Sequence, residues 1–285
     1  VSTLTQQIGL LGYPVSHSIS PIFQQSALDH CSIDARYVAW SVRPEDLQGQ
    51  VEKLRADEYL GAGVTIPYKE RVMPFLDSVD STAFDIGAVN TIVNDQGRLV
   101  GYNTDVHGFM QGLRWTAKFH PEGKRVLVIG AGGAARAGVF GLVRSGVALV
   151  TVANRTEERA RSLVREFTGT GVDRVAIGMD GDELGIALSQ ADLVVNATSV
   201  GMLHGTAEGV VPFELDSIRP TALVYDMVYT PQDTPFLMEA RMLGANTIGG
   251  LPMLVYQGAK SFKLWTSVDA PMEVMFNAAS NALSG

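Results

Sequence analysis

Disulfides and metal-ligand pairs are the first features that the sequence lacks. Cys31 is the only cysteine among the 285 residues, so no internal disulfide can form. It follows a helix-like segment, and we interpret it as a small packed residue rather than a nucleophile. The five histidines include no pair at metal-ligand spacing, so we expect no metal. Sparse cysteine is typical of a reducing compartment, which predicts a cytoplasmic protein.

Long apolar runs and basic clusters are missing as well. No window approaches 18 uninterrupted apolar residues, which argues against a membrane span. Residues 1–10 lack the basic segment and apolar core of a secretory signal. The 22 Lys and Arg against 30 Asp and Glu give a formal net charge of −8 and form no block. Nucleic acid needs a clustered basic face, so we expect a small-molecule partner and a protein that is either a monomer or a homodimer.

The rest of the composition is that of an ordinary globular protein, with 46% hydrophobic and 18% charged residues. A length of 285 residues favours two domains. In the middle of the chain, short runs rich in Val, Leu and Ile alternate with helix-compatible segments. Strands buried on both faces of a parallel sheet have this appearance. We therefore predict a doubly wound α/β sheet with strands at 125–130, 148–154, 174–178, 191–199 and 222–229.

The first hundred residues also alternate between strand and helix patterns. A hairpin is predicted over 90–103, because two apolar runs flank Asp95-Gln96-Gly97. The last segment reads as two helices split at Ala270-Pro271. Further strands are expected at 7–12, 35–42 and 61–67, and helices at about 20–31, 44–56 and 68–78.

Together these patterns predict two α/β domains with a cleft between them. Residues 1–105 form a substrate-binding and catalytic domain, which the C-terminal helices of 252–285 complete. Residues 106–251 form a Rossmann-type cofactor domain with a doubly wound parallel sheet.

The segment "VLVIGAGGAARA" carries a dinucleotide-binding pattern. Gly130, Gly132 and Ala135 fit G-x-G-x-x-G/A directly after a predicted strand and at the start of a predicted helix. The first glycine permits a tight turn, and the second lets the backbone approach a pyrophosphate. The helix N-terminus then offers unpaired N–H groups to the phosphates.

The end of the next strand indicates which dinucleotide binds. An NAD site places an acidic residue there for the ribose 2′-hydroxyl. This chain has Asn154, Arg155 and Thr156, with Arg159 one helical step further on. A guanidinium presents a fork of donors that suits a 2′-phosphate, so the sequence predicts NADP.

Polar side chains follow several predicted strands of the first domain. Lys69 comes just after "VTIP", Asn90 and Asp105 lie at or near the ends of short apolar strands, and Thr65 ends another. The ends of strands in open α/β sheets face the ligand crevice. The first predicted strand is likewise followed by "GYPVSHSISP", which is rich in small polar residues. These positions resemble a site more than a solvated surface.

At this point the chain strongly resembles the shikimate dehydrogenase family over nearly its full length. The resemblance rests on motifs in order: "GYPVSHSISP", "VTIPYKE", "GAVNTI", "GYNTD", "GAGGAARA", "NRTEERA", "NATSVGM", "YDMVYTP" and "GGLPMLVYQGAKSFKLWT". It implies reversible, NADPH-dependent reduction of 3-dehydroshikimate to shikimate, with Lys69 and Asp105 as the catalytic pair.

The resemblance also implies the remaining site residues. Ser16 and Ser18 would bind the substrate carboxylate, with Tyr229 near it, and His17 would structure the loop between the serines. Thr65, Asn90 and Gln257 would hold the ring hydroxyls, together with Asp105. The cofactor would contact Gly130, Ala131, Gly132, Gly133, Ala134, Ala135, Asn154, Arg155, Thr156, Arg159, Thr198, Ser199, Met227, Gly250 and Met253.

The chain departs from the family at Gly63, where the family usually has an asparagine that helps to bind a substrate hydroxyl. Either water or a neighbouring group fills the space, or the substrate or the activity differs. A quinate or amino-analogue dehydrogenase of the same fold therefore stays open as an alternative. A non-catalytic NADP-binding module would be expected to have lost the Lys–Asp pair, and both residues are present.

Overall fold

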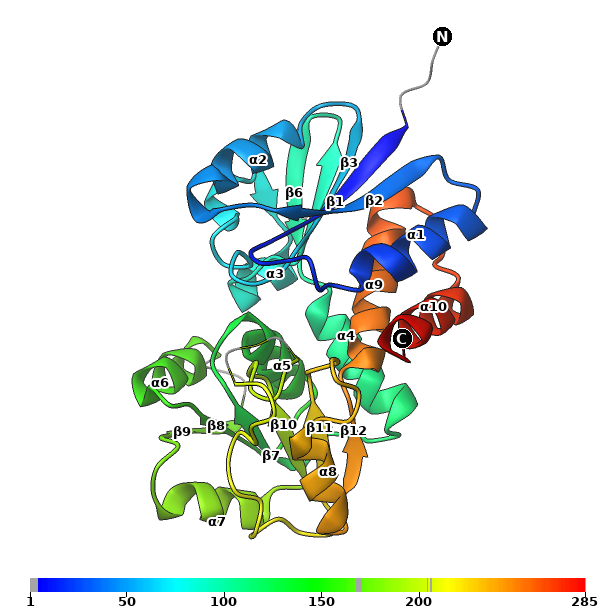
Figure 1. The fold of residues 1–285 in the computed structure, drawn as a ribbon. Coiled ribbons are helices and arrows are strands. Elements are labelled where there is room, and N and C mark those ends of the chain that lie inside the picture. Colours follow the sequence, from blue (N-terminus) through cyan, green and yellow to red (C-terminus); the bar gives the residue numbers. More distant parts are fainter. Residues whose placement is uncertain (1–4, 168–170, 204, 206, 285) are drawn as a thin grey trace. The chain divides into compact units, whose positions relative to one another are not determined.

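The computed structural model of the chain divides into two compact units (Figure 1). Unit 1 comprises Val1–Gly108 and Val255–Gly285, and unit 2 comprises Phe109–Leu254. The residues that the structure describes are 5–167, 171–203, 205 and 207–284. The two points where the chain passes from one unit to the other fall inside helices α4 (Asp105–Gln111) and α9 (Leu251–Thr266).

Unit 1 contains a six-stranded mixed sheet in the order β2-β1-β3-β5-β6-β4. The first three of these strands are parallel, whereas β5 runs antiparallel to both of its neighbours. The predicted hairpin is confirmed as β5 and β6, joined at Gln96 and Gly97. The strands are β1 (Gln6–Gly12), β2 (Ala35–Ser41), β3 (Tyr59–Val64), β4 (Ser78–Val79), β5 (Thr91–Asp95) and β6 (Arg98–Tyr102).

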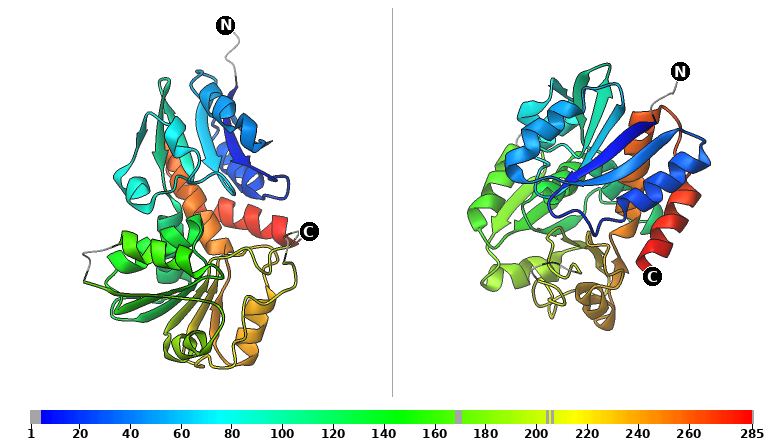
Figure 2. Two further views of the ribbon diagram at one scale, coloured as in Figure 1. Left: turned by 90° about the vertical axis from the view of Figure 1, so that its left-hand side faces the viewer. Right: turned by 45° about the horizontal axis from the view of Figure 1, so that its top comes forward.

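The helices of unit 1 match the sequence pattern at both ends of the chain. Helix α1 (Ser20–His30) and the C-terminal pair, α9 and α10 (Met272–Ser284), form where they were predicted. Figures 1 and 2 show α10 alongside α1, and Gln24 of α1 donates a hydrogen bond of 2.9 Å to the carbonyl of Gly258 in α9. The remaining helical segments are η1 (Pro44–Asp46), α2 (Leu47–Lys53), η2 (Met73–Phe75), α3 (Ser81–Ile86) and α4.

The predicted helix over 68–78 is wrong. Only the short 3-10 turn η2 forms there, and Pro74 lies in its first turn, where it has no N–H to continue a helix. Leu76 is already extended, and the N–H of Asp77 donates to the carbonyl of Leu99 at 3.0 Å. Pairing with β6 draws this segment into the sheet as β4, so a tertiary contact overrides the local helix pattern.

Unit 2 contains an all-parallel sheet in the order β12-β11-β10-β7-β8-β9. This order confirms the predicted doubly wound fold, since the chain starts in the middle and winds outward in both directions. Its strands are β7 (Arg125–Ile129), β8 (Leu149–Ala153), β9 (Asp173–Ile177), β10 (Leu193–Asn196), β11 (Leu223–Asp226) and β12 (Asn246–Ile248). The edge strand β12 was not predicted, because three residues are too few to show a pattern.

The helices of unit 2 begin with a π-helical turn, η3 (Gly112–Thr116). They continue with α5 (Gly133–Arg144), α6 (Glu157–Glu166), α7 (Asp182–Gln190) and α8 (Pro235–Met242). None of the helices in the described part of the chain is both long and apolar enough to cross a membrane.

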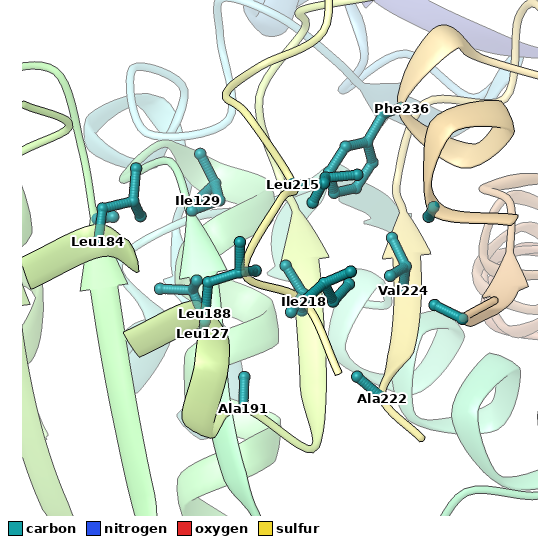
Figure 3. Packing of buried hydrophobic residues seen from close by; sticks show 14 of the residues in the cluster. Leu127, Ile129, Leu184, Leu188, Ala191, Leu215, Ile218, Ala222, Val224 and Phe236 are labelled. Carbon is teal, nitrogen blue, oxygen red and sulfur yellow. The ribbon is translucent and has the colours of Figure 1, made fainter. Parts of the chain in front are cut away.

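One face of this sheet packs against α7 and α8 (Figure 3). Ile129 of β7 and Val224 of β11 are buried with Leu188 of α7 and Phe236 of α8. Full burial of such a side chain contributes about 1.5–3 kcal/mol. This core fixes the carboxyl ends of the central strands, where the predicted cofactor residues lie.

A buried carboxylate ties two of these strand ends together. Asp226, the last residue of β11, accepts hydrogen bonds from Asn196 Nδ2 (2.9 Å), Val228 N (3.0 Å) and Thr234 Oγ1 (2.6 Å). Asn196 ends β10, and Thr234 caps α8. Burial raises the pKa of Asp226 to about 6, although all three donors act to lower it.

A close backbone approach fixes the centre of the unit 1 sheet. Gly61 in β3 has a φ of +145°, and a Cβ there would lie 2.1 Å from the carbonyl oxygen of Ile92. The same position would be 2.9 Å from Nε1 of Trp265, which itself donates to that carbonyl. Only glycine fits both the backbone conformation and the space.

We expect Gly61→Ala to lower the free energy of unfolding by at least about 2 kcal/mol, since overpacking and strain each cost about 1–3 kcal/mol. The matched control is Gly49→Ala in α2, where a Cβ meets nothing within 4 Å. Alanine should stabilise that helix by about 0.5–1 kcal/mol. Urea unfolding followed by circular dichroism measures both, and equal effects of the two substitutions would contradict the close approach.

The buried Asp226 predicts a pH-dependent stability difference. Its pKa is raised in the folded protein, so its contribution to stability is complete below its unfolded pKa of about 4 and is lost as the pH rises through about 6. The wild type should therefore lose up to about 3 kcal/mol relative to Asp226→Asn between pH 4 and pH 7.5. Urea unfolding of both proteins across this range gives the difference. A difference that is constant with pH would mean that Asp226 stays ionised throughout.

Candidate active site

An ion pair lies at the centre of the candidate substrate site in unit 1. Nζ of Lys69 lies 2.5 Å from Oδ2 of Asp105, and the side chain of Asp105 is 5% exposed while that of Lys69 is 18% exposed. Lys69 therefore keeps access to a ligand while its partner is enclosed. The two residues are 36 positions apart in the chain, so the fold brings them together.

The turn at the start of α4 fixes the position of Asp105. It is the first residue of α4, and its N–H donates to Oδ1 of Asn103 at 3.0 Å. The side chain of Asn103 also donates to the carbonyl of Ala88 at 2.9 Å. The "NTD" turn thus begins the helix and holds the carboxylate at the end of β6.

Asn90 connects the ion pair to the rest of the site. Its Nδ2 donates to Oδ1 of Asp105 (2.9 Å), Oγ1 of Thr104 (2.9 Å) and Oε1 of Gln257 (3.2 Å). Its Oδ1 accepts the backbone N–H of Thr104 at 2.8 Å. Of the predicted substrate residues, Lys69, Asp105, Asn90 and Gln257 therefore form one hydrogen-bonded cluster, with Gln257 supplied by α9.

Three further hydroxyl residues of this cluster were not predicted. Ser261 Oγ lies 2.7 Å from Oγ1 of Thr91 and 2.9 Å from Oγ1 of Thr104. Ser261 follows Gln257 by four residues, one turn along α9, and Thr104 stands inside the "GYNTD" motif. The four-residue spacing places Ser261 on the same side of α9 as Gln257, and this could have been noticed in the sequence. It points to the cluster only when α9 is known to pack on this sheet.

The serine-rich loop directly follows β1. Thr65 contacts its start, because its N–H donates to Leu11 and its Cγ2 lies 2.5 Å from where a Cβ of Gly12 would be. Ser16 is exposed, and Ser18 is half-buried with its Oγ accepting the N–H of Ser20 at 3.2 Å. Hydroxyl groups at the carboxyl end of β1 are therefore available to a ligand.

Gly63 lies in regular β3 without a left-handed φ angle. The nearest heavy atom to a Cβ at this position would be Oη of Tyr37, at 2.9 Å. The neighbouring group that fills part of the space beside this glycine is thus a phenol from β2.

The candidate cofactor site in unit 2 starts with the glycine turn between β7 and α5. Gly130 has a φ of +109°, and a Cβ there would approach Ala197 and Thr198 to 3.1–3.2 Å. A Cβ on Gly132, the N-cap of α5, would meet nothing within 4 Å. No side chain caps this helix, so the first N–H groups at Gly133, Ala134 and Ala135 are available to a phosphate.

The predicted 2′-phosphate residues lie after β8. Asn154 donates to the carbonyl of Thr156 at 2.8 Å, which shapes the turn into α6. Arg155 and Arg159 are exposed, and neither forms an ion pair with the described residues. By contrast, Arg161 and Arg165 of the same helix pair with glutamates. Two uncommitted guanidinium groups therefore lie where a 2′-phosphate is expected.

The remaining predicted cofactor residues lie at the ends of β10 and β11 and at the start of α9. The N–H and Oγ1 of Thr198 both donate to Oδ1 of Asn196. Met227 donates its N–H to the carbonyl of Asn196, and a Cβ on Gly250 would lie 2.3 Å from the carbonyl oxygen of Met227. Ser199 is exposed, Met253 is buried, and Tyr229, predicted to lie near the substrate carboxylate, is a half-buried residue of unit 2.

His107 in α4 carries no positive charge at neutral pH. Burial lowers the pKa of His107, and the positive charge of Lys260 lowers it further, so this imidazole is neutral at pH 7. No group of three or more His, Cys, Asp or Glu in the described residues could hold a metal ion. The ammonium of Lys69 is an electrophilic group that this cluster offers to a ligand.

Family models match most of the chain in both units. Family models match residues 10–92 (shikimate dehydrogenase substrate binding domain), 116–224 (shikimate/quinate 5-dehydrogenase) and 250–279 (shikimate 5′-dehydrogenase C-terminal domain). The shikimate dehydrogenase (NADP(+)) of Moorella thermoacetica is 44% identical over 99% of this chain and 95% of its own length. That of Geobacillus kaustophilus is 45% identical over 90% and 91%.

A solved structure extends the likeness to the fold. The shikimate 5-dehydrogenase of Thermus thermophilus in complex with NADP(H) and shikimate has a TM-score of 0.86 and 37% identity, covering 98% of this chain and 100% of its own. Full-length identity of this size, three matching family models and the hydrogen-bonded Lys69–Asp105–Asn90 cluster lead to one assignment. The chain belongs to the shikimate dehydrogenase family.

Proposed function

We propose that this protein catalyses the reversible, NADPH-dependent reduction of 3-dehydroshikimate to shikimate. The observation that carries the proposal is the ion pair of Lys69 and Asp105, which is held by Asn90 and open to a ligand on the lysine side. The relatives of this chain from Moorella thermoacetica and Geobacillus kaustophilus are shikimate dehydrogenases (NADP(+)). The similar structure from Thermus thermophilus is a complex with NADP(H) and shikimate.

Lys69 supplies the acid chemistry. When a ketone is reduced, negative charge develops on the carbonyl oxygen, and a nearby ammonium stabilises this charge and donates the proton. Asp105 accepts a hydrogen bond from Nζ, which keeps the ammonium group oriented. Because Asn90 binds the other carboxylate oxygen, Asp105 cannot rotate away from Lys69 without losing a second bond.

The amide and hydroxyl groups around this pair bind the ring of the substrate. Asn90 and Gln257 carry both donors and acceptors, as a polyol requires. Thr65 adds a hydroxyl beside the loop that carries Ser16 and Ser18, whose hydroxyls donate to the substrate carboxylate. Such neutral donors bind an anion without a buried counter-charge.

The glycine turn after β7 and the two free arginines hold the cofactor. The N–H groups at the start of α5 bind the pyrophosphate, and Arg155 and Arg159 bind the 2′-phosphate. Bound NADPH supplies the hydride for the reduction. The family model that matches residues 116–224 describes shikimate/quinate 5-dehydrogenases. Quinate is therefore the second candidate substrate.

The nicotinamide absorbance at 340 nm tests the proposed function directly. Shikimate or quinate is added to the protein with NADP⁺ or NAD⁺, which gives four combinations. We expect shikimate with NADP⁺ to have the highest kcat/KM. A higher kcat/KM for quinate would make quinate the substrate. No turnover in any combination would indicate a protein that binds the cofactor without catalysing this reaction.

Lys69→Ala should reduce kcat by at least about 10²-fold, the lower range for acid–base catalysis. NADP⁺ affinity should change little, because the proposed cofactor residues are in unit 2. The matched control is Lys263→Ala, which removes an exposed lysine that also lies 2.5 Å from an aspartate. Asp105→Asn should resemble Lys69→Ala, and the double variant should lose far less than the product of the two effects. A decrease in kcat of less than tenfold for Lys69→Ala would contradict the role of Lys69 as the proton donor.

Arg155→Ala should raise the KM for NADPH by about tenfold or more, because a charge-assisted hydrogen bond contributes about 1.5–3 kcal/mol. The KM for NADH should stay the same, since NADH lacks the 2′-phosphate. Arg165→Ala in the following helix, α6, is the control, because that arginine already pairs with Glu158. Equal increases for both cofactors would indicate that Arg155 is structural.

A further inference from the structure

Three buried hydroxyl groups surround the amide of Asn90 in unit 1. Thr91 begins β5, Thr104 directly precedes α4, and Ser261 lies in α9, so three separate parts of the unit supply them. The exposed fractions of these three residues are 0%, 2% and 2%, and that of Asn90 is 4%. Polar groups enclosed to this extent need hydrogen-bond partners. The orientation of each group therefore depends on the others.

Their hydrogen bonds connect the four residues into a closed ring. Nδ2 of Asn90 lies 2.9 Å from Oγ1 of Thr104, which lies 2.9 Å from Oγ of Ser261. Ser261 Oγ lies 2.7 Å from Oγ1 of Thr91, and Thr91 donates to Oδ1 of Asn90 at 3.0 Å. A hydroxyl has one proton to donate and can also accept. The ring is complete when each hydroxyl accepts from one neighbour and donates to the next, from Nδ2 of the amide round to its Oδ1.

A backbone group determines the direction of this ring. The N–H of Thr104 donates to Oδ1 of Asn90 at 2.8 Å, and an N–H only donates, so this atom of the amide is the oxygen. Nδ2 is then the atom that faces Oγ1 of Thr104, which accepts while its own proton goes to Ser261. Ser261 also lies 3.0 Å from the carbonyl of Gln257, and when it donates there it accepts from both threonines. Nδ2 faces Thr104 in either arrangement.

The ring directs one hydrogen of the Asn90 amide at the proposed catalytic pair. Nδ2 carries two hydrogens. One is taken by Thr104, and the other faces Oδ1 of Asp105 at 2.9 Å, with Oε1 of Gln257 at 3.2 Å. The second oxygen of Asp105 binds Nζ of Lys69. Rotating the amide by half a turn would place its oxygen against the carboxylate and its Nδ2 against the N–H of Thr104. The hydroxyl ring therefore opposes that rotation.

We propose that Ser261 and Thr91 are positioning residues for the pair of Lys69 and Asp105, and that they act through the amide of Asn90. This inference rests on the proposed function, because it concerns the pair that transfers the proton. Hydrogen bonds in a buried network strengthen one another, so the loss of one hydroxyl weakens the whole ring. The fixed amide orients Asp105, which in turn orients the ammonium of Lys69.

The first test is Ser261→Ala, which removes one hydroxyl from the ring. The proton of Thr104 can then turn to Oδ1 of Asn90, 3.2 Å away. We expect kcat for shikimate oxidation to fall by about 2- to 12-fold, the change that one neutral hydrogen bond carries. KM for NADP⁺ should stay the same. Ser145→Ala in unit 2 is the matched control, because that hydroxyl donates to the carbonyl four residues earlier at 2.7 Å, as Ser261 does at 3.0 Å.

Substitutions of Thr91 test the ring from β5. Thr91→Val keeps the shape of the side chain without the hydroxyl and should lower kcat as Ser261→Ala does. Thr91→Ser keeps the hydroxyl and should retain nearly all of the wild-type kcat. The double variant Ser261→Ala, Thr91→Val should lose less than the product of the single effects, because both substitutions break the same ring.

The Asn90→Ala background separates positioning from a structural role. Neither Ser261→Ala nor Thr91→Val should lower kcat further there, because the amide through which they act is absent. A full additional loss in this background would overturn the inference. So would a lower melting temperature with an unchanged kcat, measured well below the unfolding transition, because the hydroxyls would then serve stability alone.

The side-chain amide signals of Asn90 test the ring without turnover. NMR spectra identify these signals by their loss in Asn90→Ala, and transfer into D₂O gives the exchange rates of the two Nδ2 hydrogens. Exchange should be about 2- to 12-fold faster in Ser261→Ala than in the wild type, because the amide opens only when the ring breaks. Equal exchange rates would overturn the inference.

The two kinds of measurement distinguish failure of this inference from failure of the proposed function. If the wild type oxidises shikimate and both Ser261→Ala and Thr91→Val keep the full kcat, the inference fails while the proposed function stands. If the wild type does not turn over shikimate, the proposed function fails, and the exchange rates still decide whether the ring holds Asn90.

Discussion

The carboxylate of Asp105 is the group on which the organisation of unit 1 depends. A buried charge is tolerated only when it is paired and hydrogen-bonded. One oxygen faces Lys69 and the other faces Asn90, while the backbone of Asp105 is held by Asn103. These partners come from separate strand ends, so satisfying one carboxylate aligns several elements at once. The ion pair that stabilises the fold here also leaves the side chain of Lys69 partly exposed.

Unit 2 also contains a buried carboxylate, that of Asp226. Asp226 is fully buried, and its hydrogen-bond partners among the described residues are three neutral donors. These donors come from the end of β10, from the loop after β11 and from the cap of α8. The backbone segment that carries Met227 is thereby held beside the end of β10.

Glycines determine where backbone and ligands can approach in both units. Gly130 is required by a left-handed turn next to Thr198, and Gly61 by the carbonyl of Ile92. Gly63 has an ordinary φ angle, but a Cβ there would lie 2.9 Å from the hydroxyl of Tyr37, so a side chain is the group that approaches this glycine closely.

The sequence by itself determined the doubly wound sheet, the hairpin of β5 and β6, the C-terminal helices and the family. Those features depend on local periodicity, turn residues and motifs, which can be read from adjacent positions. Only the tertiary structure decided that Ser78 and Val79 join the sheet as β4, that Ser261 and Thr104 extend the polar cluster, and that Tyr37 reaches Gly63. Each of these results depends on contacts between residues far apart in the chain, and such contacts leave no periodic signal because the packing that creates them is specified by the whole fold.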